Sequence, residues 1–161
     1  SSAGAADESH IENWDVMDDW SLLDESDTGL RMKRPLKEGV RVGAGMLIGV
    51  KVKDSPRYTL GSVRWALREG NDSLASGIQL FHGEPQPVAV KVMEASDPPP
   101  AWRQAFLLAG ASAQPATLVV PPGTFRLDRG VEVMVGKEVR VLKLFRVLDR
   151  GIEFERCEFH D

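Results

Sequence analysis

The amino-acid sequence predicts an all-β fold composed of two small β units. Three observations support this prediction: many short segments alternate apolar and polar residues, turn residues separate these segments, and only residues 101–109 show helical spacing. A chain of 161 residues can form one sizeable domain or two small ones. Short strands at this spacing are typical of a closed barrel or a sandwich.

The first β unit is predicted over residues 13–96. It follows residues 1–12, which are small and polar and which we expect to be a flexible acidic leader. The predicted strands show period-two alternation and are 30–33, 46–53, 63–67, 78–80 and 88–92. Turn residues lie between them, at 43–45, 54–56, 70–72 and 83–85.

A Pro-rich linker and a short helix are predicted over residues 97–115. Proline cannot donate to a sheet ladder, so the three prolines at 98–100 favour an extended linker. Helical spacing follows and stops at Gly110; it is carried by Trp102, Ala105, Phe106 and Ala109. Residues 116–161 are the predicted second β unit, with strands at 116–120, 125–127, 131–135, 139–148 and 152–159. The alternative is that these strands complete the first unit.

The composition excludes several classes of protein. No apolar run approaches the ~18–20 residues that a membrane-spanning helix requires, and the first residues lack the basic and apolar segments of a signal peptide. The single cysteine, Cys157, excludes an internal disulfide and a cysteine-rich zinc site. We therefore expect a soluble protein of a reducing cytoplasm.

The formal charge of −4 is unevenly distributed along the chain. Residues 1–27 contain nine acidic residues and no Lys or Arg, whereas the rest contains 15 acidic and 20 basic residues, a balance of +5. Such a basic body could hold a compact anion; the alternative is a solvated acidic tail beside an ordinary surface. No recognition-helix pattern or zinc-finger spacing is present, so we expect no nucleic-acid partner.

The motifs of common catalytic and cofactor sites are missing from the sequence. The three histidines are far apart, and no nucleophile-elbow or phosphate-loop motif is present. The pair Gly43 and Gly45 lacks the spacing of a dinucleotide-binding loop. We expect a protein that is not an enzyme, holds no metal or cofactor, and binds a ligand or a protein partner.

One short motif favours a ligand. Asp24, Ser26 and Gly29 form Asp-x-Ser-x-x-Gly between two β-type stretches. A carboxylate can accept paired hydrogen bonds from a guanine edge, a hydroxyl can bind a base or a phosphate, and glycine permits close approach of a ligand. Downstream, Arg31 and Arg34 belong to a group of five basic residues that would suit a dianion. The alternative is that Asp and Ser only cap a turn.

This motif, with the strands and glycines that follow it, resembles the PilZ domain, a bacterial β-barrel family that commonly senses cyclic di-GMP. The resemblance continues through segments 42–50, 60–65 and 76–81. It implies a six-stranded barrel over residues 13–96 with extra β structure after it. It also implies a regulatory receptor or effector of bacterial signalling that binds cyclic di-GMP through the motif residues Asp24, Ser26 and Gly29. Arg31 and Arg34 are candidate ligand residues from the basic cluster, and either could replace one clamp of the family. The alternative is a degenerate PilZ-like module that binds a protein and no nucleotide.

The chain departs from the family in a second motif. Ligand-binding PilZ proteins carry Arg-x-x-x-Arg shortly before the first strand, and its arginines clamp the phosphates and stack on the guanines. Residues 1–23 contain no arginine. The same spacing occurs at Arg146 and Arg150, which we interpret as a coincidence at a strand end. We therefore predict that residues 1–161 bind cyclic di-GMP weakly or not at all. An Arg-x-x-x-Arg upstream of Ser1 would favour the receptor over the degenerate module.

Overall fold

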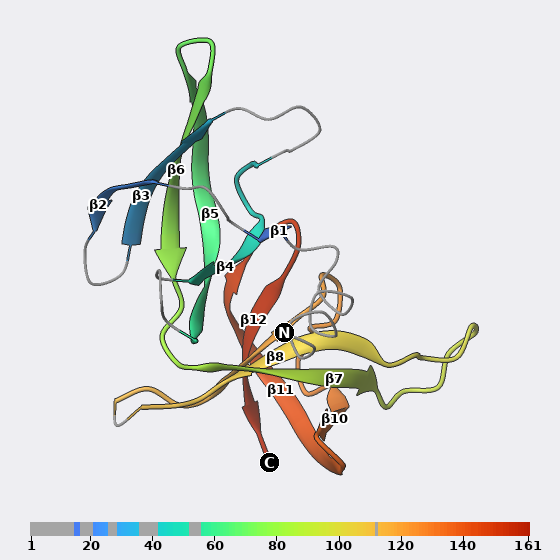
Figure 1. Ribbon diagram of the computed structural model, residues 1–161. Helices are drawn as coiled ribbons and strands as arrows, with labels where there is room; N and C mark the ends of the chain where they lie inside the picture. The colour runs from blue at the N-terminus through green and yellow to red at the C-terminus, as the bar shows by residue number, and fades with distance from the viewer. Residues whose placement is uncertain (1–14, 17–20, 26–28, 36–41, 52–55, 112) are drawn as a thin grey trace. The chain divides into compact units, whose positions relative to one another are not determined.

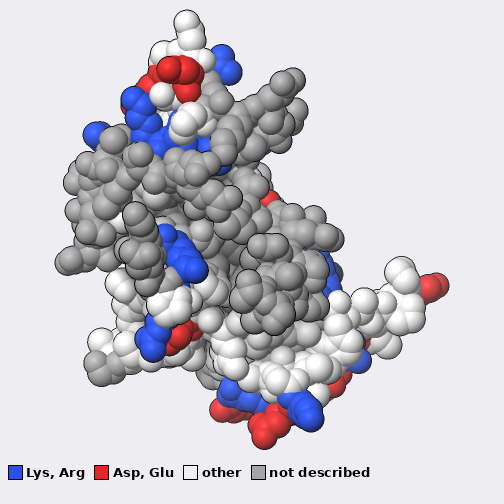
Figure 2. Space-filling view, in the orientation of Figure 1, with Lys and Arg blue, Asp and Glu red and all other residues white. Residues whose placement is uncertain are grey.

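The computed structural model describes residues 15–16, 21–25, 29–35, 42–51, 56–111 and 113–161 (Figure 1). These residues form twelve β-strands and no helix, which confirms the predicted all-β class. The predicted leader, residues 1–12, lies outside the described residues. Where described residues are in view, Figure 2 shows acidic and basic side chains close together. The described part of the chain contains no helix with the length and apolarity needed to cross a membrane.

The chain divides into two compact units, residues 1–82 and 83–161. The first contains a six-stranded sheet with strands β1 (Asp15–Val16), β2 (Ser21–Glu25), β3 (Gly29–Pro35), β4 (Leu47–Lys51), β5 (Tyr58–Glu69) and β6 (Ser73–Leu80). The strands lie in the order β1-β4-β5-β6-β3-β2, and all neighbours are antiparallel except β1 and β4. The long β5 and β6 form a hairpin at the centre of this sheet, with Gly70 at φ 66° in the predicted turn (Figure 1).

One face of this sheet carries a hydrophobic core. Met32, Ile48, Val63 and Ile78 pack together and are at most 8% exposed. Alternation along the strands produces this face, because successive side chains of a strand point to opposite sides. Full burial of a side chain of this size stabilises a fold by about 1.5–3 kcal/mol, so this cluster holds the sheet together.

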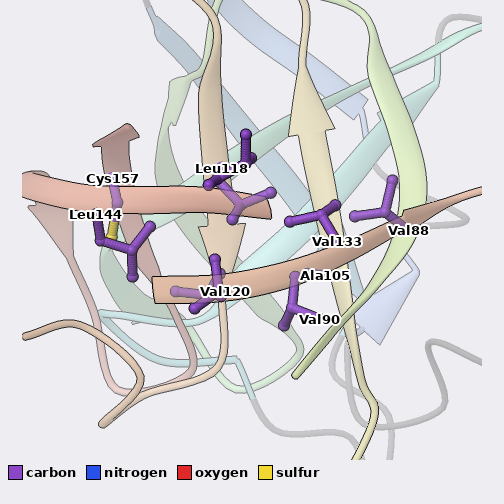
Figure 3. Packing of buried hydrophobic residues seen from close by; sticks show 10 residues of the cluster. Val88, Val90, Ala105, Leu118, Val120, Val133, Leu144 and Cys157 are labelled. Atoms are coloured by element: carbon purple, nitrogen blue, oxygen red, sulfur yellow. The ribbon is translucent and has the colours of Figure 1, made fainter. Parts of the chain in front are cut away.

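The second unit is a closed six-stranded barrel. Its strands are β7 (Pro85–Val92), β8 (Arg103–Leu108), β9 (Thr117–Val120), β10 (Gly130–Val135), β11 (Glu138–Arg150) and β12 (Glu155–His160). All neighbours in the order β10-β11-β12-β9-β8-β7 are antiparallel, and the pairing of β7 with β10 closes the barrel. Inward-facing side chains from these strands fill the interior (Figure 3). Among them, Leu118, Leu144 and Cys157 are at most 1% exposed.

The barrel lies later in the chain than the sequence predicted. We expected closure over residues 13–96, whereas the barrel begins at Pro85 and the described strands of the first unit form a sheet that does not close. Strand β7 accounts for this difference. The alternation at 88–92 correctly predicts a strand there, but this strand pairs with β8 and β10 of the second unit and not with strands of the first. Alternation identifies a strand without identifying its partners. The chain accordingly divides after His82, and the prolines at 98–100 lie within the second unit.

The predicted helix over residues 101–109 is wrong, because this stretch contains strand β8. The adjacent Ala105 and Phe106 are 0% and 1% exposed, so the strand is buried on both faces. Such a strand loses its alternation, and its apolar residues can then match helical spacing. The predicted strand at 125–127 is also wrong, since these residues lie in the connection between β9 and β10. The other four predicted strands of this region are confirmed as β9 to β12.

Candidate functional site

The Asp-x-Ser-x-x-Gly motif lies at the connection between β2 and β3. Asp24 is near the end of β2, and Gly29 is the first residue of β3. Ser26 lies outside the described residues. The two strands are antiparallel, and β2 is the last strand of the sheet order, so the motif belongs to the edge of the six-stranded sheet.

Four residues on neighbouring strands form one row across this sheet. Asp24 of β2 is opposite Arg31 of β3. Gly77 of β6 comes next and is opposite both Arg31 and Trp65 of β5. We call these four residues the cross-strand row. Neighbouring strands are about 4.8 Å apart, so the row extends over about 14 Å. It unites two predicted site residues, Asp24 and Arg31, with two that the sequence analysis did not single out.

Two irregularities in the ladders set the ends of the row. The register of β2 shifts between Leu22 and Asp24, and the register of β5 shifts between Val63 and Trp65. An extra residue in one strand moves the residues that follow it to the other face of the sheet. Bulges of this kind are enriched beside functional sites, where they redirect side chains. Here they bring Asp24 and Trp65 into the same row.

Arg31 and Arg34 lie on opposite faces of β3. Arg31 is exposed, whereas Arg34 is 7% exposed and shares the core face with Met32. Residues three positions apart in a strand point to opposite sides, so both arginines cannot join one site on this strand. The structure therefore places Arg31 in the cross-strand row and leaves Arg34 out of it.

Trp65 lies flat on Gly77. A Cβ atom added to Gly77 would come within 2.1 Å of Trp65 Nε1, 2.4 Å of Cε2 and 2.8 Å of Cδ1. Such closeness to three bonded ring atoms places this position against the face of the ring and not beyond its edge. Trp65 is nevertheless 37% exposed. One face of the indole thus covers the backbone of β6 while the side chain remains accessible to solvent.

The remaining charges near the row include an ion pair. Lys33 of β3 and Glu69 of β5 are 3.5 Å apart, with side chains 42% and 52% exposed. An exposed pair of this kind contributes at most ~1 kcal/mol to stability, so both side chains can rearrange around a ligand. Within the described ranges, no three side chains of His, Cys, Asp or Glu are grouped as metal ligands would be.

The Arg-x-x-x-Arg spacing of the second unit lies on β11. Arg146 binds Glu158, and Arg150 Nε donates a hydrogen bond to Glu155 at 3.2 Å. Both glutamates belong to β12 and are buried, whereas the arginine side chains are 61% and 58% exposed. The two arginines therefore offset the charge of two carboxylates that the barrel buries.

A second candidate surface lies on the outside of the barrel. Val139 and Val141 of β11 are 49% and 55% exposed. Val141 is opposite Glu132, which forms an ion pair with Lys91 at 3.7 Å. Lys91 also lies 4.8 Å from the centre of the Trp102 ring. We call these five residues the barrel outer face. Exposed apolar side chains next to an aromatic residue and charges are typical of protein-interaction surfaces.

The second unit also matches a known protein family. Residues 88–161 match the family described as FimW C-terminal beta-barrel domain. The matched segment begins within β7 and covers the rest of the closed barrel, just under half of the chain. Comparison with the curated proteins and with the solved structures found no match. The six-stranded sheet, with its cross-strand row, lies outside the matched segment.

Proposed function

We propose that this chain is a non-enzymatic regulatory module that binds cyclic di-GMP on its six-stranded sheet and a protein partner through its barrel. The similarity of the barrel to a FimW-type domain supports the broader statement, a regulatory or interaction module. The resemblance of the first unit to PilZ domains supports the ligand and a bacterial, cytoplasmic setting.

The cross-strand row is the observation that carries the ligand proposal. Its register puts Asp24 next to Arg31, an exposed cation, on the strand pair that contains the motif. In the proposed complex Asp24 accepts hydrogen bonds from the N1–H and 2-amino groups of guanine. Arg31 pairs with a phosphate, for which its planar guanidinium is suited. Ser26 lies between the two strands in sequence and contributes a hydroxyl, and Gly29, the first residue of β3, leaves room for the ligand.

The proposal is tested by titrating the 161-residue chain with cyclic di-GMP and following its backbone amide resonances. We expect weak, saturable binding, with shifts concentrated in β2, β3, β5 and β6. Loss of a charge-assisted contact typically costs about 1.5–3 kcal/mol, so Arg31→Ala should weaken binding by about tenfold or more. Arg103→Ala, which removes an exposed arginine of β8, is the matched control and should leave the affinity unchanged. Shifts confined to the barrel, or their absence at saturating ligand, would refute the proposal.

The barrel outer face favours a second candidate, a module that binds a protein and no nucleotide. Its exposed valines, Val139 and Val141, provide an apolar contact area that needs no ligand. This candidate predicts an amide spectrum unchanged by cyclic di-GMP. It also predicts that Val141→Lys abolishes binding of the protein partner without lowering thermal stability, because the lysine lies opposite Glu132, whereas Arg31→Ala leaves partner binding intact.

A further inference from the structure

We infer that Trp65 is an aromatic platform on which one base of a cyclic dinucleotide stacks. The inference rests on the proposed function and extends it from the motif residues to the opposite end of the cross-strand row. It assigns Trp65 to ligand binding, and it assigns Gly77 the role of keeping the indole flat on the sheet.

The first step is the position of the indole. In a strand of regular alternation Trp65 would share the buried face of Val63, which is 1% exposed. The register shift between these two residues turns Trp65 to the other face, where it is 37% exposed. A large aromatic side chain that leaves the core in this way gives up stabilisation from burial. At this position the ring is accessible to a ligand.

The second step is the conformation of the indole. Any residue other than glycine at position 77 would put a Cβ atom 2.1 Å from Trp65 Nε1. With glycine there, the ring rests on the backbone of β6 and has little freedom to tilt. A ring already fixed in this orientation loses little conformational entropy when a base stacks on it.

The third step is the order of chemical groups along the row. Trp65 and Arg31 are separated by two strand spacings, about 10 Å, and Asp24 follows after one more. An aromatic, a basic and an acidic residue at register positions in this order match a base, a phosphate and a second base recognised by its edge. A ligand with two bases can use the whole row, whereas a mononucleotide can use only one end. The arrangement therefore favours a cyclic dinucleotide.

The test combines affinity with tryptophan fluorescence, using cyclic di-GMP as the probe. Base–aromatic stacking is strong enough that Trp65→Ala should weaken binding by about tenfold or more. Gly77→Ala should have a similar effect, because it keeps the tryptophan but displaces the ring. Trp65→Phe should retain part of the affinity and lose the share of the ligand-induced quenching that comes from Trp65. The matched control is Trp102→Ala, since Trp102 is 38% exposed but belongs to the barrel; affinity and quenching should persist.

The outcomes separate this inference from the function on which it rests. If the wild-type chain binds cyclic di-GMP and both Trp65→Ala and Gly77→Ala bind equally well, the platform is refuted and the proposed function stands. If the wild-type chain does not bind, both are refuted. Trp65→Phe distinguishes a lost contact from a lost fold, because its amide spectrum should show an intact sheet. Quenching of the same size in wild type and in Trp65→Phe would also refute the platform.

Discussion

The carboxylate of Glu155 accepts a hydrogen bond from the backbone N–H of Phe125, 30 residues earlier in the chain, at 2.8 Å. Its second oxygen accepts from the N–H of Gly123 at 3.2 Å and from Arg150 Nε at 3.2 Å. Glu155 itself is 5% exposed. A single buried side chain of β12 thus fixes the connection that follows β9, where no strand ladder is available to pair these backbone groups.

We expect Glu155→Ala to lower the free energy of unfolding of the barrel by about 2–4 kcal/mol, because it leaves backbone donors unpaired and frees Arg150. Glu155→Gln should cost less, since its carbonyl oxygen can still accept one of these bonds. Denaturant unfolding followed by circular dichroism measures both changes. Glu138→Ala, at an exposed position of β11, is the control and should stay within about 0.5 kcal/mol of wild type. Equal stability of Glu155→Ala and Glu138→Ala would contradict this account.

The thiol of Cys157 gives the barrel a pH dependence in alkali. Burial, and next to it the charge of Glu155, raises the pKa of Cys157 from 9.0 to about 12. The unfolded chain therefore loses this proton at a lower pH than the folded chain. Between pH 9.0 and about 12, stability should fall as the pH rises, by up to ~1.4 kcal/mol per pH unit.

Comparison with Cys157→Ala isolates this contribution from other groups that titrate in alkali. The variant should be less stable at neutral pH because it leaves a cavity in the barrel core. Its deficit relative to wild type should shrink as the pH rises above 9.0. A deficit that stays constant up to pH 11 would show that the thiol ionises as easily in the folded chain as in the unfolded one.

Gly61 is expected to be essential for the β5–β6 hairpin. A Cβ atom there would lie 2.8 Å from the backbone oxygen of Gln79 and 2.9 Å from Ile78 Cγ2. Backbone atoms cannot move aside cheaply, so Gly61→Ala should lower the free energy of unfolding by about 1–3 kcal/mol. Gly43→Ala is the natural comparison, because a Cβ atom at Gly43 meets nothing within 4 Å. Thermal unfolding of the two variants should differ clearly; the same melting temperature for both would disprove the tight contact.

Regular alternation explains which parts of the fold were predictable from the sequence. β10 and β11 were identified because their buried and exposed residues alternate over several positions. β8 was mistaken for a helix because burial on both faces removes that signal. The closed barrel was predicted in the wrong part of the chain, because alternation predicts a strand but not the strands with which it pairs.

The candidate site was only partly predictable for a related reason. The motif identified Asp24 and the cluster of basic residues identified Arg31, since both signals are local in sequence. Regular alternation along the predicted strand 63–67 puts Trp65 on the face of Val63. The register shift that moves it to the other face leaves no mark in the sequence. The row itself depends on the pairing of four strands, and such pairing is a property of the fold.

The different faces of β3 give a final prediction, which compares two arginines of one strand. Arg34 is 7% exposed, so its aliphatic stem packs in the sheet, and its replacement removes that packing. We expect Arg34→Ala to lower the free energy of unfolding by about 2 kcal/mol, and Arg31→Ala, at an exposed position, to change it by less than about 0.5 kcal/mol.

For binding of cyclic di-GMP the order of the two variants should reverse. Arg31→Ala should weaken binding, and Arg34→Ala, measured below its unfolding transition, should not. Titration of both variants at a temperature where each is folded would decide. A stronger loss of binding in Arg34→Ala would mean that the ligand site lies on the core face of β3 and not along the cross-strand row.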